Sequence, residues 1–323
     1  MEWFDPAMTI GGLVIGIVVG LTGMGGGALM TPMLVFFFQV PTLAAISSDV
    51  LISLVMKPFG GFVHALRGTV HWKLVLWLCI GSVPGAFGGA YVISILPGGD
   101  TLDQVLRICL GIALLLAALG LIARAWMGVV QRHTLLGEGP AEERRPDVQV
   151  RRLWTLLLGL SGGFMVGITS VGAGSLIIVV LLLLYPKLKA SQLVGTDLMQ
   201  AIPLVGAATV GHLLFGEVDF SVTGSILIGA IPGAVIGALI SSRAPGGIIR
   251  RALAILLMAS GLALVGVPAP WIVGLGIAAI VLGNIGWAVA RNQYHRRKDA
   301  RRAAGAKESD SEPEHAVRGS STD

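Results

Sequence analysis

Charged residues are scarce in this chain. They make up 13% of its 323 residues, whereas hydrophobic residues make up 54% and the mean hydropathy is +0.82. Soluble domains carry about 25% charged residues, so the composition excludes an ordinary soluble protein. It predicts an integral membrane protein with the lipid bilayer as its surroundings.

The chain also lacks the residue patterns that enzymes and metal proteins need. Its two cysteines, Cys79 and Cys109, fall inside apolar stretches and have neither disulfide nor metal-site spacing. The glycines within 23–27 are not followed by the Gly-Lys-Ser/Thr of a nucleotide-binding loop. No Ser/His/Asp set stands in a nucleophile-elbow context. We therefore expect no enzyme activity, no cofactor and no bound metal.

Long apolar stretches, in contrast, are abundant, and a membrane crossing needs about 20 such residues. They lie at Ala7–Val40, Leu43–Leu66, Trp72–Leu96, Leu102–Ala125, Leu153–Tyr185, Ala190–Phe215, Phe220–Ser242, Ile248–Val267 and Trp271–Ala290. The pattern predicts an all-α polytopic membrane protein in five parts. These are a membrane repeat at 7–126, a cytoplasmic linker at 127–152, a second repeat at 153–267, an additional transmembrane helix at 268–290, and a basic, then disordered, cytoplasmic tail at 291–323.

The two halves of the apolar region repeat each other. Asp49 matches Asp197 and His64 matches His212, in each case 148 residues later. The segments Gly81–Gly85 and Gly229–Gly233 match at the same spacing, and both contain a Pro-Gly pair. Constant spacing over several matches indicates an internal duplication.

The longest apolar stretch of each half is interrupted by small residues. Glycine weakens a helix, because it loses much backbone entropy on ordering and has no side chain to pack. Unwound backbone at membrane depth is tolerated only where protein buries it or where it lines a cavity. Two interrupted segments at corresponding positions therefore predict a transporter binding site.

An anion suits these interruptions. A broken helix exposes free N–H groups and the positive end of a helix dipole, and nearby hydroxyl groups suit sulfonate oxygens. We predict substrate-binding residues at Thr22, Gly23, Met24, Gly25, Gly26 and Gly27, at Thr169, Ser170, Gly172, Ala173, Gly174 and Ser175, and at Lys57. The alternative is that these glycines only permit close helix packing, although packing glycines usually recur every four residues.

Ionisable residues inside the apolar stretches are functional candidates. Asp49, Lys57 and His64 lie on one stripe of one expected helix. Asp197 and His212 lie on the equivalent face of the second copy. We predict that Asp49, Asp197, His64 and His212 carry coupling protons. Alternatively, the two aspartates anchor helix starts, the two histidines are interfacial, and Lys57 only neutralises Asp49.

The positions of Lys and Arg predict the orientation. If each broken stretch enters and leaves the membrane on one side, all but two of the 23 Lys and Arg are cytoplasmic. The exceptions are Arg107, outside, and Lys57, within the membrane. This predicts two inverted-topology repeats, each a broken or re-entrant helix pair plus three transmembrane helices. The N-terminus is then outside a bacterial inner membrane and the C-terminus is cytoplasmic. The basic cluster Arg291–Arg302 is expected to contact anionic lipid head groups rather than nucleic acid.

The paired glycine stretches, with Ser-Ser-Asp and Gly-Thr-Asp triplets about 20 residues downstream, resemble the TauE/SafE family of sulfite and organosulfonate exporters. The resemblance covers about Ile10 to Val267. It implies export of small sulfur oxyanions or related organic anions, with positions 22–27 and 169–174 at the substrate.

We therefore expect a secondary active transporter that exports a small anion by alternating access, coupled to the proton gradient. A passive anion channel, a non-transporting membrane scaffold and an intramembrane enzyme are the alternatives. The sequence leaves the oligomeric state open.

Overall fold

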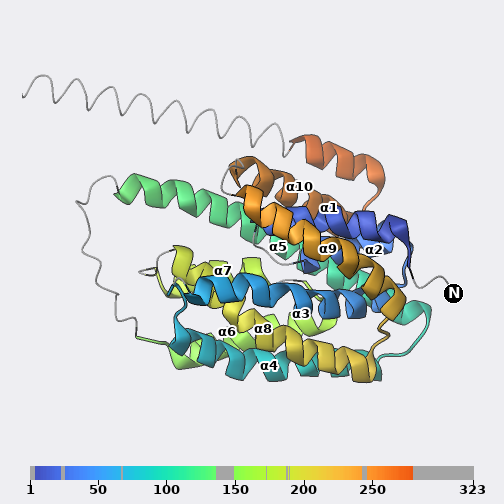
Figure 1. The fold of residues 1–323 in the computed structure, drawn as a ribbon, viewed down its shortest axis with the longest axis horizontal. Helices are drawn as coiled ribbons and strands as arrows, with labels where there is room; N and C mark the ends of the chain where they lie inside the picture. The colour runs from blue at the N-terminus through green and yellow to red at the C-terminus, as the bar shows by residue number, and fades with distance from the viewer. Residues whose placement is uncertain are drawn as a thin grey trace, which may run out of the picture. The chain divides into compact units, whose positions relative to one another are not determined.

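Every regular element that the structure describes is a helix, as the composition predicts. The computed structural model describes residues 4–22, 26–66, 68–135, 149–171, 173–186, 188, 190–241 and 246–278. Ten helices are labelled in Figure 1: α1 (Pro6–Thr22), α2 (Gly27–Phe36), α3 (Thr42–Leu66), α4 (Trp72–Ile95), α5 (Asp100–Leu135), α6 (Arg152–Thr169), α7 (Ala173–Leu184), α8 (Ala190–Phe215), α9 (Phe220–Ser241) and α10 (Gly246–Leu264). A further helix covers Ala269–Ala278.

The chain divides into two compact units, 1–272 and 273–323. Helices α1 to α10 belong to the first unit, and the described residues of the second, 273–278, are helical. Helix α5 continues to Leu135, so the beginning of the expected polar linker is helical. Residues 136–148, most of the expected additional helix and the whole expected tail lie outside the described residues.

Five described helices are long and apolar enough to cross a membrane: Trp72–Ile95, Asp100–Ala123, Arg152–Thr169, Gln192–Phe215 and Phe220–Ile240. Their outward faces carry large apolar side chains, such as Leu76, which is 60% exposed, and Leu239, which is 74% exposed. Apolar surface of this extent is not stable in water. The chain is an integral membrane protein.

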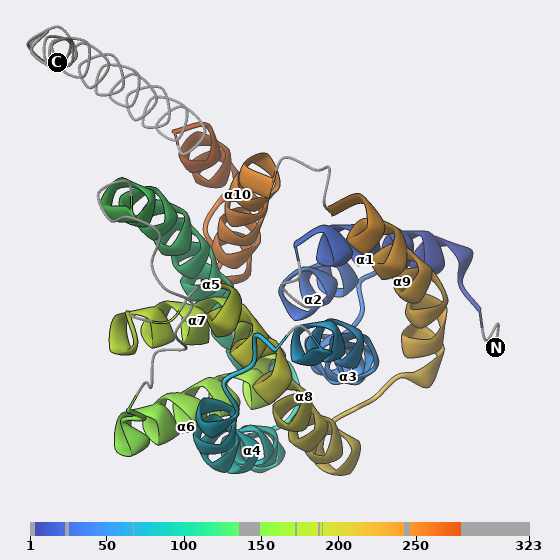
Figure 2. The ribbon, with the colours of Figure 1, turned by 60° about the vertical axis from the view of Figure 1, so that its left-hand side comes forward.

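Helix α1 lies along α9, and α4 lies along α6 (Figure 2). Gly12 and Gly16 of α1 meet the backbone of Ile226 and Ala230 in α9, so the two helices are parallel. At each contact a Cβ on the glycine would clash with the facing carbonyl oxygen. The same contacts recur between α4 and α6, and in all four helices the glycines are spaced by four residues: 12, 16 and 20; 81, 85 and 89; 159, 163 and 167; 229, 233 and 237.

Helices α3 and α8 are the corresponding third helices of the two halves, and they are antiparallel. Ser47 near the start of α3 hydrogen-bonds His212 near the end of α8, and Gly61 near the end of α3 meets Ile202 near the middle of α8. Helices α5 and α10 also correspond and are also antiparallel, because Gly111 meets Val265 while Leu115 meets Gly261.

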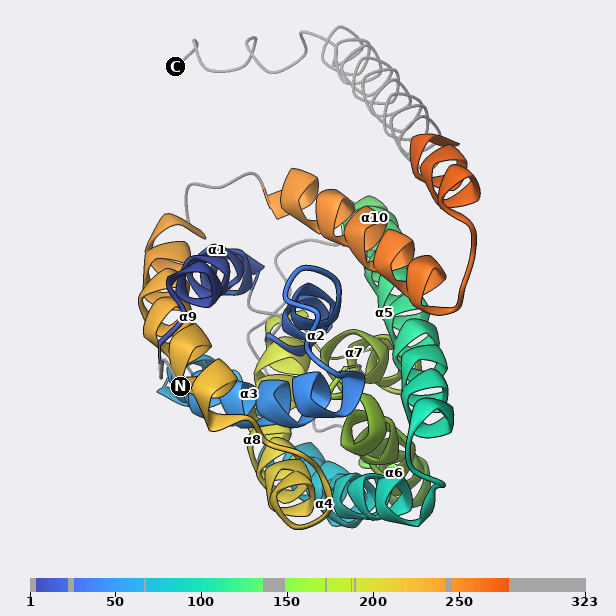
Figure 3. The same cartoon turned by 90° about the vertical axis from the view of Figure 1, so that its right-hand side faces the viewer.

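The short helices α2 and α7 run back along the helices that precede them. Gly11, early in α1, lies against Met33, late in α2. In the same way Thr155, early in α6, hydrogen-bonds the hydroxyl of Tyr185, just after α7, at 2.6 Å. Each interruption is thus a reversal of chain direction. Figure 3 shows α2, α3 and α7 surrounded by the pairs α1–α9, α5–α10 and α4–α6.

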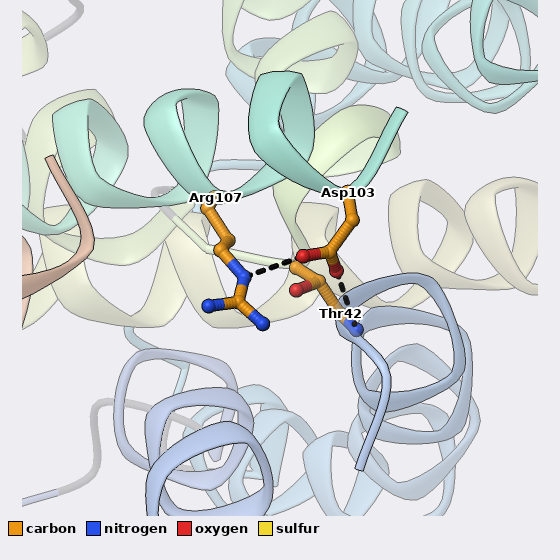
Figure 4. A network of polar contacts seen from close by, with 3 residues as sticks. All are labelled: Thr42, Asp103 and Arg107. Atoms are coloured by element: carbon orange, nitrogen blue, oxygen red, sulfur yellow. Dashed lines mark hydrogen bonds and ion pairs between the residues drawn. The ribbon is translucent and has the colours of Figure 1, made fainter. Parts of the chain in front are cut away.

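Acidic residues gather where α1, α3, α5 and α9 begin. Asp5 donates its backbone N–H to Ser225 of α9 at 3.0 Å, and Asp219 donates its own to Ser48 of α3 at 3.2 Å. Asp103 of α5 accepts from the backbone N–H of Thr42 at 3.3 Å and pairs with Arg107 at 2.6 Å (Figure 4).

Basic residues lie at the opposite end, with Lys73 in the first turn of α4 and Arg151 and Arg152 at the start of α6. The backbone N–H of His71 binds Thr196 of α8 at 3.0 Å. The Arg152 guanidinium of α6 lies over the Trp77 ring of α4, 5.4 Å from its centre. The bundle therefore has an acidic end and a basic end.

Candidate functional site

The two interrupted stretches meet in the interior of the first unit. Gly27, the first residue of α2, lies against the carbonyl oxygen of Ser170, so closely that no Cβ would fit. Ser170 ends α6 with a left-handed backbone, φ 59°. Asp49 of α3 lies beside both residues, and the Ser170 hydroxyl donates to its Oδ2 at 2.7 Å. One carboxylate therefore joins three segments that are far apart in the sequence.

The Asp49 carboxylate is fully buried, and only one of its oxygens is satisfied. Oδ2 accepts hydrogen bonds from Thr31 of α2, at 2.6 Å, and from Ser170. Oδ1 has no hydrogen-bond partner among the described residues, and neither does the hydroxyl of Ser53, one helical turn further along α3. Buried polar atoms are nearly always hydrogen-bonded, so two such atoms together mark a place where something else can bind.

Gly26 leaves space beside these atoms. A Cβ built on it would lie 3.8 Å from Ser53 Oγ, 3.9 Å from Asp49 Oδ1 and 3.9 Å from Met56 Sδ, which are ordinary contact distances. The backbone of Gly26 is right-handed helical, with φ −71° and ψ −32°, so it does not itself require glycine. The absence of a side chain at this position leaves a small space beside two oxygen atoms and the sulfur atom of Met56.

The contiguous glycines thus have different roles. Gly27 is required for close packing, the alternative that the sequence left open, whereas Gly26 has room for a Cβ at ordinary contact distances. Gly23, Met24, Gly25 and Gly172 lie outside the described residues. Ala173, Gly174 and Ser175 form the first turn of α7, and their side chains also lie outside the description.

Lys57 lies on the same face of α3 as Asp49 and Ser53, two turns beyond Asp49. It is half-buried, and it interacts electrostatically with Asp197 most strongly and with Asp49 next. Lys57 therefore interacts with one carboxylate from each half of the chain.

Asp197 occupies the matching position on α8 but has different neighbours. It is 3% exposed, and the side-chain amide of Gln200 donates to its Oδ1 at 3.5 Å. Gln200 in turn accepts from the Ser82 hydroxyl of α4 at 3.3 Å.

The hydroxyl residues next to the two aspartates hold the ends of neighbouring helices. Ser48 accepts from the backbone N–H of Asp219, directly before α9, and Thr196 accepts from that of His71, directly before α4. These partners are 148 positions apart, like the aspartates. The shared triplets therefore fix a helix start with the hydroxyl group and place a carboxylate in the core with the next residue.

The two histidines are held by hydroxyl groups. His212 is 1% exposed, with Nε2 2.8 Å from the carbonyl oxygen of Gly167 and Nδ1 2.9 Å from Ser47 Oγ. A carbonyl only accepts, so Nε2 carries the proton and donates it. His64 is half-buried, with Nδ1 2.9 Å from Thr69 Oγ1.

The two threonines at the interruptions bond to their own helices. The Thr22 hydroxyl donates to the carbonyl oxygen of Val18 at 2.8 Å, and that of Thr169 donates to Met165 at 2.7 Å. Of the predicted hydroxyl donors, Ser170 is turned into the site, where it binds Asp49.

Sequence reasoning did not find Thr31, Gln200 or Ser82. Thr31 stands alone among apolar residues and precedes Pro32 inside α2. The available signal was a lone hydroxyl residue nine positions after Thr22, the last residue of the preceding helix. Gln200 follows Asp197 by three residues, so it lies on the same helical face.

A groove of about 710 Å³ lies elsewhere, between α6 and α7. Its walls are Trp154, Leu157, Leu158, Leu160, Ser161, Phe164, Val180 and Leu184. An open, apolar groove on these helices suits lipid chains and not an anion. The site at the interruptions therefore remains the candidate for substrate.

The chain is similar to a known family of membrane proteins. The model of the family described as sulfite exporter TauE/SafE matches residues 8–264. The chain is similar to the probable membrane transporter protein YjnA of Bacillus subtilis, at 35% identity over 65% of this chain and 79% of that protein. It is also similar to YdhB of the same organism, with 23% identity over 64% and 78%, and to MJ0441 of Methanocaldococcus jannaschii, with 26% over 57% and 64%; both are likewise named probable membrane transporter proteins. No solved structure matches the chain.

Proposed function

Because the chain belongs to the sulfite exporter TauE/SafE family, we propose that it is a secondary active transporter that exports a small sulfur-containing or organic anion. The observation that carries the proposal is the meeting of the two interrupted stretches beside Asp49, with Lys57 on the same helix face. Charges inside a membrane cost free energy, and a purely structural scaffold would gain nothing from them.

Alternating access requires two bodies that can move against each other around a central site. We propose that the halves are inverted-topology repeats. Corresponding helices α3 and α8 are antiparallel, and so are α5 and α10, as inversion requires. The first helix of each half packs on the fourth labelled helix of the other, through matched glycines. These contacts join α1 to α9 and α4 to α6. The two helix pairs are candidates for the rigid bodies that move against each other.

The substrate anion would bind between Lys57 and the N-terminal end of α2. The positive end of a helix dipole and an ammonium group both attract negative charge. In this structure Asp49 and Asp197 are the carboxylates that interact with Lys57. An anion that binds there must compete with them, which ties substrate binding to the charge state of the aspartates.

Coupling to the proton gradient would use this competition. A proton taken up by Asp49 or Asp197 would remove one of the negative charges that compete for Lys57. The Lys57 ammonium would then bind the substrate anion. His64 and His212 are the other proton candidates. His212 is the weaker of these two, since a carbonyl group already takes its Nε2 proton and Ser47 holds its Nδ1.

The test is flux of methanesulfonate in proteoliposomes, with and without an imposed pH gradient. This sulfonate keeps its charge at all working pH values, so a pH gradient can act on it only through the protein. Accumulation against its gradient is the expected result. Downhill flux alone would identify a passive channel, and no flux would identify a scaffold.

A variant pair ties the flux to the site. Gly26→Leu should abolish transport while the protein still inserts, because the larger side chain blocks the N-terminal end of α2 next to Asp49. Gly88→Leu is the control, since a Cβ at Gly88 would meet no atom within 4 Å among the described residues. Equal flux in both variants would contradict the assignment of the site.

A further inference from the structure

We propose that the oxygen atoms around Asp49 form a binding site for a monovalent metal cation of the size of sodium. The site consists of Asp49 and Ser53 of α3, Thr31 of α2 and Ser170 at the end of α6. The inference rests on the proposed function and names a coupling ion for it. In this inference Asp49 binds the metal cation, and Asp197 remains the candidate residue for carrying the coupling proton.

Two unsatisfied oxygens point to a ligand. Asp49 Oδ1 and Ser53 Oγ are buried and have no partner among the described residues, and both face the space at Gly26. A proton on Oδ1 would need an acceptor such as Ser53 Oγ, and these two oxygens are not hydrogen-bonded to each other in this geometry. A cation binds both oxygens at once through their lone pairs.

Apart from the thioether sulfur of Met56, the polar atoms described around the carboxylate are also oxygens. The Thr31 and Ser170 hydroxyls bind Oδ2, and the carbonyl oxygen of Ser170 reaches Gly27 from the same side. Ser170 caps the C-terminal end of α6, where the helix dipole is negative. In transporters with discontinuous helices, helix C-termini and unwound carbonyls coordinate cations in this manner.

Charge also favours a monovalent ion. Lys57 interacts electrostatically with both Asp49 and Asp197, so it is not the counter-ion of Asp49 alone. The site has a single carboxylate, whereas calcium sites usually combine several carboxylate ligands. One added positive charge neutralises it. The neutral site would then no longer repel a substrate anion at the N-terminus of α2.

Binding is tested on the full-length protein in detergent by thermal unfolding, in sodium chloride or choline chloride at the same concentration and pH. At a sodium concentration of ten times the dissociation constant the unfolding midpoint should rise by about 2–4 °C. Asp49→Asn and Ser53→Ala should lose the rise. Asp197→Asn is the matched control and should keep it. A rise of equal size in Asp49→Asn, or in potassium chloride, would overturn the site.

A second variant pair separates the site from the fold. Gly26→Ala makes only ordinary contacts and suits a helical backbone, so it should fold as well as the wild type. Its methyl group occupies the proposed cation space, and the sodium-dependent rise should disappear. Gly27→Ala should instead lose folded protein, because its Cβ clashes with the Ser170 carbonyl. A Gly26→Ala protein that folds and responds fully to sodium would refute the proposal.

Transport distinguishes this inference from the function on which it rests. Methanesulfonate flux in proteoliposomes should rise severalfold with a sodium gradient over choline at constant pH. Flux that is equal in sodium and choline overturns the cation site and leaves the transporter standing. No flux under any condition overturns the proposed function, while the unfolding experiment still decides on cation binding.

Discussion

Asp49 and Asp197 show how a duplicated residue acquires different roles. They occupy matched positions, and the hydroxyl before each one fixes a helix start in the same way. Asp49 is bound by hydroxyl groups from α2 and α6, whereas Asp197 is bound by the Gln200 amide of its own helix. Lys57 has no counterpart in the second half, where the matching residue is Val205. The centre of the protein is therefore asymmetric although its frame is repeated.

The histidines show the opposite behaviour, in which different residues fill the same role. Ser47 provides the hydroxyl for His212, and Thr69 provides it for His64. The residue that matches Ser47 is Gly195, and a Cβ there would lie 2.8 Å from Thr69 Oγ1. Gly195 thus makes room for the threonine hydroxyl. His212 ties α8 to α3 and α6, whereas His64 holds the loop that follows its own helix.

Lys57 provides the sharpest test at the scale of single residues. Lys57→Met leaves Asp49 and Asp197 without the cation that they share, so it should lower both the stability and the affinity for methanesulfonate. Losing one partner of a fully buried ion pair costs about 3–5 kcal/mol, and half-buried Lys57 should cost less. The readouts are the unfolding midpoint and equilibrium binding in detergent.

The double variant Lys57→Met with Asp197→Asn separates the two effects. It removes one charge of each sign, so stability should recover while anion affinity stays lost. Lys57→Arg should restore affinity only in part, since a planar guanidinium replaces a compact ammonium. Full anion affinity in the double variant would show that Lys57 is only a counter-ion.

At the scale of helices, the spacing of the glycines distinguishes the helix face that packs against a neighbouring helix from the face that does not. Gly85 and Gly88 lie one turn apart on α4, but only Gly85 faces the α6 backbone, at Leu160. Gly85→Ala should destabilise the protein by about 1–3 kcal/mol because the helices must separate. Gly88→Ala should be neutral or stabilise it by up to about 1 kcal/mol, through the higher helix propensity of alanine.

The unfolding midpoints of these two variants in detergent are the measurement. Similar losses in both would mean that glycine matters to α4 through its backbone and not through the contact with α6. Each variant differs from the wild type by one methyl group, so each is the control of the other.

The helices themselves were largely predictable. The ends of α3 and α8 fall at Leu66 and Phe215, where the apolar stretches end, because solvent and lipid demand different residues on the two sides. The partners of Asp49 were not predictable, because they depend on how three distant segments approach each other. The different roles of Gly26 and Gly27 were not predictable either, because the two residues are identical in the sequence and differ only in the atoms that face them.

At the scale of the whole membrane unit, charge is sorted along the helix direction. Asp5, Asp103 and Asp219 lie where α1, α5 and α9 begin, and Arg151 and Arg152 lie at the other end, where α6 begins. By the positive-inside rule we predict that the basic end lies in the cytoplasm. Helix α4 would then run outward and α9 inward, although the two correspond in the repeat.

Cysteine labelling in intact cells tests this orientation. In a background without Cys79 and Cys109, Gly98→Cys and Glu217→Cys should react with a membrane-impermeant thiol reagent. Lys73→Cys should react only after lysis.

Gly98 and Lys73 flank the two ends of α4, and a Cβ at Gly98 meets no atom within 4 Å among the described residues. Glu217 corresponds to Thr69, four residues before Lys73, so inverted repeats put the two corresponding loops on opposite sides. Reaction of Glu217→Cys and Lys73→Cys from the same side would contradict the inversion. The reverse labelling pattern at all three positions would mean that the protein has the opposite orientation in the membrane.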